Sequence, residues 1–412
     1  MSKNTEVKKA ILIGGLCAIA YLAVYIARNI LSAVSPQMIG VDGFTNEYIG
    51  EVSAVYLSFY AIGQLINGSI GDKIKSKYMM TFGLILAGVT NLLFPYLVKT
   101  PDTAKYIYGL TGFFLSMIYG PMTKVVAENM DLLYATRCSL GYTFSSYLGS
   151  PMAGVIAAFL SWQSAFSLSS VILFLMGITC FVMFIYFEKK GFVKYHQFDR
   201  PKSEKSGGIK LLIKRQIIKF TFVSVLTGVV RTTVVFWLPN YLAQYLGFTP
   251  NQSAGIFTAA TLCISMTAFI AVFLYERLGH DMNKTILLVF SLSALFFFLV
   301  YLVKLPIVNI IFLVLAIMSS NAAATMLWSR YCTSLRDTGM VSGATGFLDF
   351  MSYMAASIAS TLFANAVADI GWVNLILIWF GLMVVGVIVA LPYEKFRKCA
   401  NKTEEISEIS RN

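Results

Sequence analysis

Residues 11–35 read ILIGGLCAIAYLAVYIARNILSAVS, an apolar run that a single charged side chain, Arg28, interrupts. A helix rises 1.5 Å per residue, so about 20 residues cross the roughly 30 Å of hydrocarbon in a bilayer. The run therefore predicts a membrane-spanning helix. A second apolar run begins near residue 48 with no small-residue cleavage site before it, so we expect the first run to be retained rather than removed as a signal peptide.

Similar apolar runs recur along the whole chain. Hydrophobic residues make up 57% of the 412 positions and charged residues 13%, which is more apolar and less charged than soluble proteins are. We expect an all-α membrane protein with twelve transmembrane helices in two six-helix bundles. The expected spans lie at 11–35, 48–70, 78–98, 105–127, 139–160, 165–187, 217–241, 253–275, 285–303, 307–329, 342–367 and 372–392.

Basic residues are distributed unevenly between the two sides of these spans. With both termini placed in the cytoplasm, 26 of the 32 Lys and Arg residues lie in cytoplasmic segments and three in external loops. Because positive charge favours the cytoplasmic side, we expect this orientation, in the plasma or inner membrane. The net charge of +12 therefore reflects topology, and no nucleic-acid partner is expected.

The chain divides into two halves around one polar, basic segment. We expect an N-terminal six-helix bundle at 1–187, a cytoplasmic linker at 188–216, a C-terminal bundle at 217–393 and a cytoplasmic tail at 394–412. Each half repeats one spacing: Arg28 precedes Pro36 by eight residues, and Arg231 precedes Pro239 by eight. Such repeats indicate duplicated bundles with a substrate site at their interface.

The arginines inside the first span of each half are candidate ligand contacts, because a buried cation is costly and marks function by default. With a period of 3.6 residues, the face of Arg28 also carries Tyr21, Tyr25, Ser32 and Ser35, which predicts a polar cavity lining. An alternative is that Arg28 snorkels to the interface or pairs with a carboxylate.

Arg231 follows the small residues Ser224, Thr227 and Gly228, and no carboxylate stands near either arginine on its own helix. Two guanidinium groups brought together at the axis therefore require an anion. The guanidinium fork matches phosphate or carboxylate with two parallel hydrogen bonds and stays protonated. Phosphate, a dianion near neutral pH, would balance both charges.

Several motifs resemble a known superfamily. The loop Gly68-Ser69-Ile70-Gly71-Asp72-Lys73 resembles the Gly-x-x-x-Asp-Arg/Lys motif of the major facilitator superfamily, where it acts as a latch between helices. Tyr25-Ile26-Ala27-Arg28-Asn29 with Pro36, and Arg231 with Trp237-Leu238-Pro239, resemble the first and seventh helices of its organophosphate:phosphate antiporters. This resemblance implies that Arg28 and Arg231 bind the phosphate of a substrate.

Further segments share this resemblance and two positions depart from it. Tyr119-Gly120-Pro121-Met122-Thr123-Lys124 is similar to the fourth helix of the family, and Gly346-Phe347 with Tyr353 and Asp369-Ile370-Gly371-Trp372 to its eleventh helix and the turn after it. Gln64, on a stripe with Tyr56, Tyr60 and Asn67, stands where these transporters often carry lysine. The two histidines, His196 and His280, lie in loops, so no intramembrane histidine relays protons.

Two further charged residues lie within the expected spans. Lys124 precedes Glu128 by four residues, a spacing that favours a local ion pair as much as a substrate contact. Asp349 stands in mid-span with Ser342, Thr345, Ser352 and Tyr353 on nearby faces. It is either a structural partner of an arginine or a charge and proton switch.

The residues, together with this resemblance, predict a secondary carrier of a small organic phosphate that exchanges it for inorganic phosphate. The alternatives are a proton-coupled transporter of another small organic anion and a transporter-like sensor of sugar phosphate. No nucleotide-binding loop, catalytic constellation or metal-ligand spacing is present in the sequence, so we expect no enzyme, cofactor or metal. We expect a monomer in the bilayer. The candidate substrate-binding residues are Arg28, Arg231, Tyr25, Lys124, Gln64, Tyr60, Tyr21, Asp349 and Tyr353.

Overall fold

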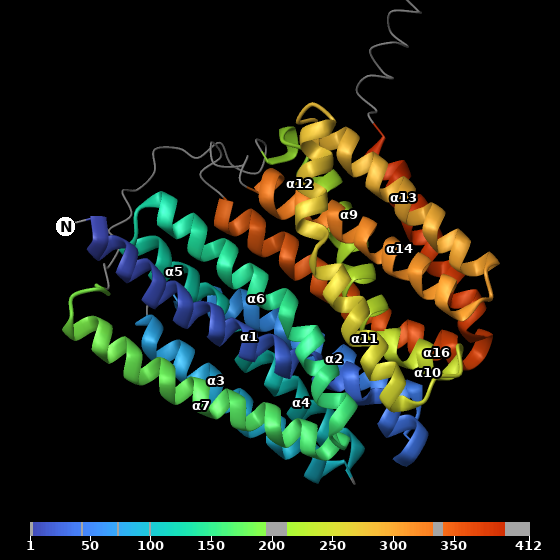
Figure 1. Cartoon of the computed structure of the whole chain (residues 1–412), viewed down its shortest axis with the longest axis horizontal. Coiled ribbons are helices and arrows are strands. Elements are labelled where there is room, and N and C mark those ends of the chain that lie inside the picture. Colours follow the sequence, from blue (N-terminus) through green and yellow to red (C-terminus); the bar gives the residue numbers. More distant parts are fainter. Residues whose placement is uncertain are drawn as a thin grey trace, which may run out of the picture.

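The computed structural model describes residues 3–42, 44–71, 74–98, 100–194, 212–332 and 341–391, and every regular element in these ranges is a helix (Figure 1). The expected linker at 188–216 lies largely outside the described residues, as do the C-terminal tail and Asp72 and Lys73 of the loop motif. The helices of the first half are α1 (Lys3–Asp42), α2 (Asn46–Gly71), α3 (Ser76–Leu97), α4 (Pro101–Leu115), α5 (Tyr119–Asn129), α6 (Leu132–Phe159) and α7 (Trp162–Lys189).

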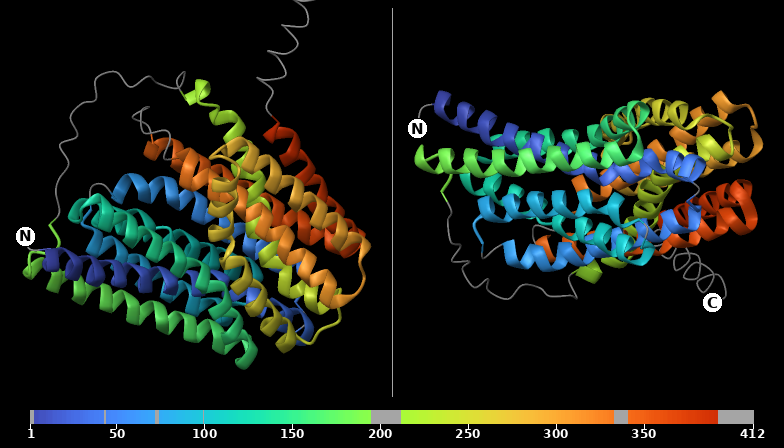
Figure 2. Two further views of the ribbon diagram at one scale, coloured as in Figure 1. Left: turned by 45° about the horizontal axis from the view of Figure 1, so that its top comes forward. Right: turned by 90° about the horizontal axis from the view of Figure 1, so that it is seen from below.

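The second half repeats this arrangement with more interrupted helices. It contains α9 (Ile217–Val229), the π-helical segment η1 (Val230–Val234), α10 (Val235–Gln244), α11 (Pro250–Ser265), α12 (Thr267–Arg277), α13 (Met282–Leu302), α14 (Pro306–Met326), the π-helical segment η2 (Leu327–Tyr331) and α16 (Val341–Ala390). The two halves lie side by side as two groups of helices (Figures 1 and 2).

The twelve expected spans correspond to the helices of the described ranges. Nine helical segments are long and apolar enough to cross a membrane, and one of them, Ala344–Ala390, contains two spans. Gly371 separates these two with a left-handed φ of 75°, a conformation that glycine adopts without strain. The pair α4 and α5 and the apolar segment Phe144–Phe159 within α6 form the remaining two spans, so the twelve-helix fold is confirmed.

The helix bounds differ from the expected spans at several ends. The helix of the first span runs from Lys3 to Asp42 instead of 11–35. It extends into the polar residues that precede the span and continues past Pro36 after it. We call the end of the molecule at which α1 begins the N-terminal side and the opposite end the far side. Within the first half α1 packs against α6 and α7, and within the second α9 packs against α16. The halves meet where α2 contacts α16, α6 contacts α11, and α1 contacts α10 and α11.

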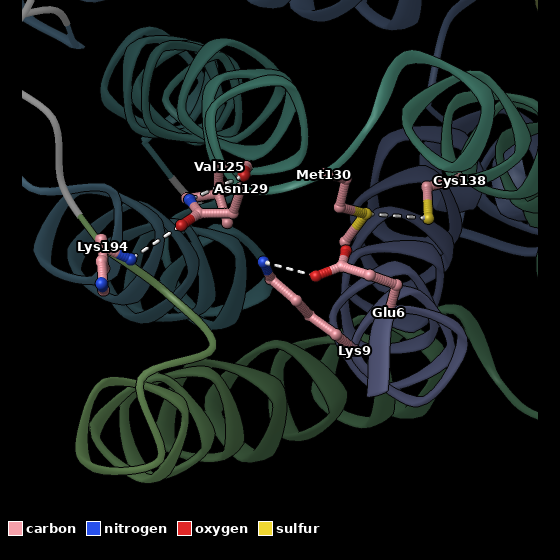
Figure 3. A network of polar contacts seen from close by, with 7 residues as sticks. All are labelled: Glu6, Lys9, Val125, Asn129, Met130, Cys138 and Lys194. Carbon is pink, nitrogen blue, oxygen red and sulfur yellow. Dashed lines mark hydrogen bonds and ion pairs between the residues drawn. The ribbon is translucent and has the colours of Figure 1, made fainter. Parts of the chain in front are cut away.

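Polar contacts join the helices of the first half on the N-terminal side (Figure 3). The Asn129 amide donates to the carbonyl of Val125 at 3.0 Å and accepts from the main-chain N–H of Lys194 at 2.7 Å. Cys138 of α6 donates its thiol toward Met130 at 3.6 Å. The contact between Lys194 and Asn129 therefore ties the segment after α7 to α5.

Candidate functional site

Arg28 lies in α1, fourteen residues before the helix ends, and its guanidinium is surrounded by aromatic rings. Its Nη1 donates to the hydroxyl of Tyr353 at 3.0 Å. Its Cζ lies 5.3 Å from the ring centre of Tyr25, 4.9 Å from that of Tyr60 and 4.7 Å from that of Tyr353. These distances are within the range of cation–π attraction, so three rings from three helices hold one charge.

A cluster of tyrosines continues from these rings toward the N-terminal side. Tyr60 packs edge-on against Tyr353 of the other half at 5.0 Å between ring centres. Tyr21 packs against Tyr25 at 4.9 Å and against Tyr119 at 5.6 Å. Their hydroxyl groups provide neutral donors and acceptors close to the arginine, which suits a polar ligand with several oxygen atoms.

Arg231 lies at nearly the same depth as Arg28, thirteen residues before α10 ends, in the π-helical segment η1. Such segments are frequent at functional sites because they shift the register of the helix by one residue. Arg231 interacts electrostatically with Arg28, Tyr25, Tyr353 and Tyr147. Within the described part of the chain neither arginine forms an ion pair with a carboxylate, so two positive charges face one another without direct neutralisation.

Asp349 is the acidic residue that faces this pair. It lies in α16 one helical turn before Tyr353, so the two side chains share a face. Its carboxylate interacts electrostatically with both Arg231 and Arg28 but makes no ion pair or hydrogen bond with the residues that the structure describes. Asp349, Arg28 and Arg231 are each only partly buried, so all three remain accessible to a ligand.

The repeated prolines lie where the two halves meet on the far side. A proline has no N–H and leaves the carbonyl four residues earlier without its helical partner. Pro36 leaves the carbonyl of Ser32 free, and the Ser35 hydroxyl donates to it at 2.8 Å. The Ser32 hydroxyl donates to the carbonyl of Phe236 at 2.7 Å, beside the carbonyl that Pro239 leaves free. Ser32 and Ser35 were expected to line a cavity, and this expectation is wrong: both are buried, the Ser32 hydroxyl bonds a carbonyl of the other half, and the Ser35 hydroxyl bonds a carbonyl of its own helix.

The structure brings together seven of the nine predicted site residues: Arg28, Arg231, Tyr21, Tyr25, Tyr60, Asp349 and Tyr353. Gln64 lies one turn beyond Tyr60 in α2, partly buried, and makes no hydrogen bond to any described residue. Lys124 lies in α5 and has an interaction of its own, while the side chain of its expected partner Glu128 lies outside the described part.

Tyr147 and Tyr119 are among the residues of the cluster that were missed as candidates in the sequence. Tyr147 of α6 reaches Arg231 and hydrogen-bonds Thr325 of α14, across the two halves. Tyr119 begins α5 and packs on Tyr21 and Tyr142. Both tyrosines lie in apolar spans, where the sequence does not distinguish a site residue from a packing residue. Only the packing of neighbouring helices shows which of the 22 tyrosines belong to the cluster.

The loop motif after the second span and the twelve spans suggested the superfamily, and the arginine motifs of the two bundles suggested one of its families. The pattern of the Major Facilitator Superfamily matches residues 17–360. The chain belongs to the Major Facilitator Superfamily. Members of this superfamily and the relatives below are membrane transporters rather than enzymes, and this one is an integral, multi-pass membrane protein.

Relatives in this superfamily include transporters of phosphorylated compounds. The glycerol-3-phosphate transporter of Bacillus subtilis is 24% identical over 258 residues, which cover 57% of this chain and 58% of that protein. The probable hexose phosphate transport protein of Chlamydia trachomatis is 22% identical over 40% of this chain and 35% of its own length. The phosphoglycerate transporter protein of Salmonella typhimurium is 22% identical over 86% of this chain and 82% of that protein. The first two matches thus span about half and about a third of those relatives, and the resemblance to the organophosphate:phosphate antiporters is confirmed.

Solved structures of this superfamily share the fold. The nucleoside transporter NupG aligns with a TM-score of 0.66 at 14% identity, over 92% of this chain and 97% of that one. A bacterial homolog of the human lysosomal transporter Spinster, in an inward-facing and occupied conformation, aligns with a TM-score of 0.70 at 10% identity, over 95% and 97%. At these identities the likeness concerns the fold alone.

Proposed function

We propose that this protein is a secondary carrier that moves a small organic phosphate across the membrane in exchange for inorganic phosphate. The observation that carries the proposal is the pair Arg28 and Arg231, one from each half, at matching depth and without an ion pair among the described residues. Two guanidinium forks offer phosphate several charge-assisted hydrogen bonds, which a single lysine could not provide.

Exchange follows from the charge of the empty site. The two arginines and Asp349 leave a net formal charge of +1 between the halves when no ligand is bound. Moving an uncompensated charge through a closed, dehydrated state is costly, whereas a bound ligand of net charge −1, such as singly charged phosphate, removes that cost. The loaded carrier therefore crosses preferentially, and uptake of one phosphate compound requires release of another.

The direction of access follows from the contacts that join the halves. Ser32 bonds Phe236, Asn46 bonds Gln244 and Ser58 bonds Ser357, all at or beyond the arginines toward the far side. These contacts close the far side. Because most basic residues fall in the segments on the N-terminal side, we place this side in the cytoplasm, with bundles at 1–187 and 217–393 that rock about the arginines.

Counterflow in proteoliposomes tests the proposal. Vesicles loaded with inorganic phosphate should take up labelled glycerol 3-phosphate, glucose 6-phosphate or a similar ester, and vesicles loaded with sulfate should not. The matched control is protein in which both Arg28 and Arg231 are replaced by alanine. Absence of phosphate-dependent uptake of every ester would overturn the carrier function.

A sensor is the second candidate, because the membrane sensor protein UhpC of Salmonella typhimurium is 23% identical over 28% of this chain and 25% of that protein. A sensor would bind phosphate esters without flux. Thermal stabilisation of the purified protein by an ester that never enters the loaded vesicles would therefore favour the sensor.

A further inference from the structure

We propose that the preferred substrate carries an ammonium group as well as a phosphate, and that Asp349 binds this ammonium while Arg28 and Arg231 bind the phosphate. The inference rests on the proposed function and extends it to the organic part of the substrate. It depends on the position of one carboxylate that faces two arginines without touching either.

The carboxylate lies among groups that come from both halves. Asp349 interacts electrostatically with Arg28 and Arg231, with Tyr60 of α2 and with Tyr119 of α5. Tyr353, one turn farther along α16, accepts the hydrogen bond from Arg28. Asp349 therefore lies beside the arginine site and on the same side of α16 as the residue that holds Arg28, within reach of a ligand that already contacts the arginines.

A structural role for Asp349 would place it in contact with a cation. Other acids of the chain show this: Glu188 lies 2.7 Å from the Nζ of Lys77, and Glu51 lies 3.0 Å from that of Lys105. Asp349 has two arginines nearby and pairs with neither among the described residues. A partly buried carboxylate left without a partner is costly, and a cationic ligand group would remove this cost.

The charges balance for a zwitterionic phosphate ester. The two arginines contribute +2 and Asp349 contributes −1, so the site carries +1. A phosphate ester dianion with one ammonium carries −1 and neutralises the site, whereas the same ester without the ammonium leaves an excess of −1. An ester with a second anionic group, such as a carboxylate, would in addition be repelled by Asp349.

Matched pairs of esters test the inference in phosphate-loaded proteoliposomes that exchange labelled inorganic phosphate. The first pair is phosphoethanolamine and 2-hydroxyethyl phosphate, and the second is glucosamine 6-phosphate and glucose 6-phosphate. Each pair differs in an ammonium against a hydroxyl group, and the two pairs differ in size. The wild-type protein should be inhibited by the ammonium compound of at least one pair at about tenfold lower concentration, since a charged hydrogen bond is worth that factor or more.

The preference should depend on the carboxylate of Asp349. In Asp349→Asn the concentration ratio within the responding pair should fall to about one or reverse, and Asp349→Glu should retain a preference for the ammonium compound. Asp369→Asn, an exposed acid on the same helix, is the matched control and should leave the ratio unchanged. The ratio is taken within each variant, so a change in overall rate does not affect it.

The outcomes separate the inference from the proposed function. Equal inhibition within both pairs by the wild-type protein would overturn the inference and leave phosphate exchange standing, as would a ratio that Asp349→Asn does not change. Absence of labelled phosphate exchange in the wild-type protein would overturn the proposed function, and the inference with it.

Discussion

The hydroxyl of Ser32 in α1 donates to the main-chain carbonyl of Phe236 in α10, 2.7 Å away, and so joins the two halves directly beyond the arginines. Ser32 lies four residues after Arg28, and Phe236 lies five residues after Arg231. The first helices of both halves therefore meet one turn from the charges that define the site. Any motion that opens the far side must break this bond.

We expect a covalent link across the far side to stop transport. The side chains of Asn46 and Gln244 exchange two hydrogen bonds of 2.9 and 3.0 Å across the halves. Replacing both by cysteine and treating with a short bis-maleimide should abolish counterflow, because the halves can then no longer separate there. The single variants, treated in the same way, control for modification of the exposed Cys263. Full counterflow by the cross-linked double variant would refute rocking about the arginines.

Lysine in place of either arginine should abolish or severely reduce counterflow. The Arg28→Lys and Arg231→Lys variants keep the positive charge but lose the planar fork that binds phosphate with two parallel bonds. Counterflow of a labelled phosphate ester, normalised to protein in the vesicles, measures the effect. Near-normal transport by both lysine variants would contradict a shared phosphate site.

Removing one hydroxyl should weaken the hold on Arg28. Tyr353→Phe loses the oxygen that accepts from Arg28 at 3.0 Å and keeps the ring beneath the guanidinium. The net free energy of one hydrogen bond, about 0.5–1.5 kcal/mol, predicts an increase of about two- to tenfold in the half-saturating concentration of phosphate. Tyr60→Phe is the matched control, because Tyr60 contacts Arg28 through its ring. An effect of Tyr60→Phe as large as that of Tyr353→Phe would show that the hydroxyl of Tyr353 is not special.

A methyl group at Gly149 should displace the helix that carries Arg28. A Cβ added to Gly149 of α6 would meet the Cβ of Tyr25 and lie 2.7 Å from its main-chain carbonyl carbon. Overpacking of this kind costs about 1–3 kcal/mol, so Gly149→Ala should lower the melting temperature and reduce phosphate exchange. Gly141→Ala, in the same helix, has no neighbour within 4 Å and should be neutral or slightly stabilising. Equal melting temperatures for the two variants would show that α1 can move away from the added methyl group without loss of stability.

The sequence predicted the spans and the arginine pair because both depend on local composition and on one repeated spacing. A run of about 20 apolar residues needs no knowledge of its neighbours to be recognised as a span. The tyrosine cluster was only partly predictable. Helical periodicity placed Tyr21 and Tyr25 on the face of Arg28, but it placed Ser32 on the same face, and the Ser32 side chain packs between the halves instead. Tyr147 of α6 and Thr325 of α14 meet across the two halves, and no pattern within either helix encodes that contact.

The same limit applies to Gln64 and to the π-helical segment at Arg231. A period of 3.6 residues assigns Gln64 to the face of Tyr60, but its side chain makes no hydrogen bond to a described residue. The extra residue in the turn at Val230–Val234 has no signature in composition, so the repeated spacing alone gave no sign of a difference between the two arginines.

They are not held alike, and binding thermodynamics should reflect the difference. Arg28 is fixed before any ligand arrives, by three aromatic rings and one hydroxyl group. Arg231 makes no hydrogen bond to a described residue. We therefore expect its side chain to be fixed in one rotamer only when phosphate binds. The conformational entropy lost when phosphate binds therefore falls mainly on one of the two side chains, the one contributed by the second half.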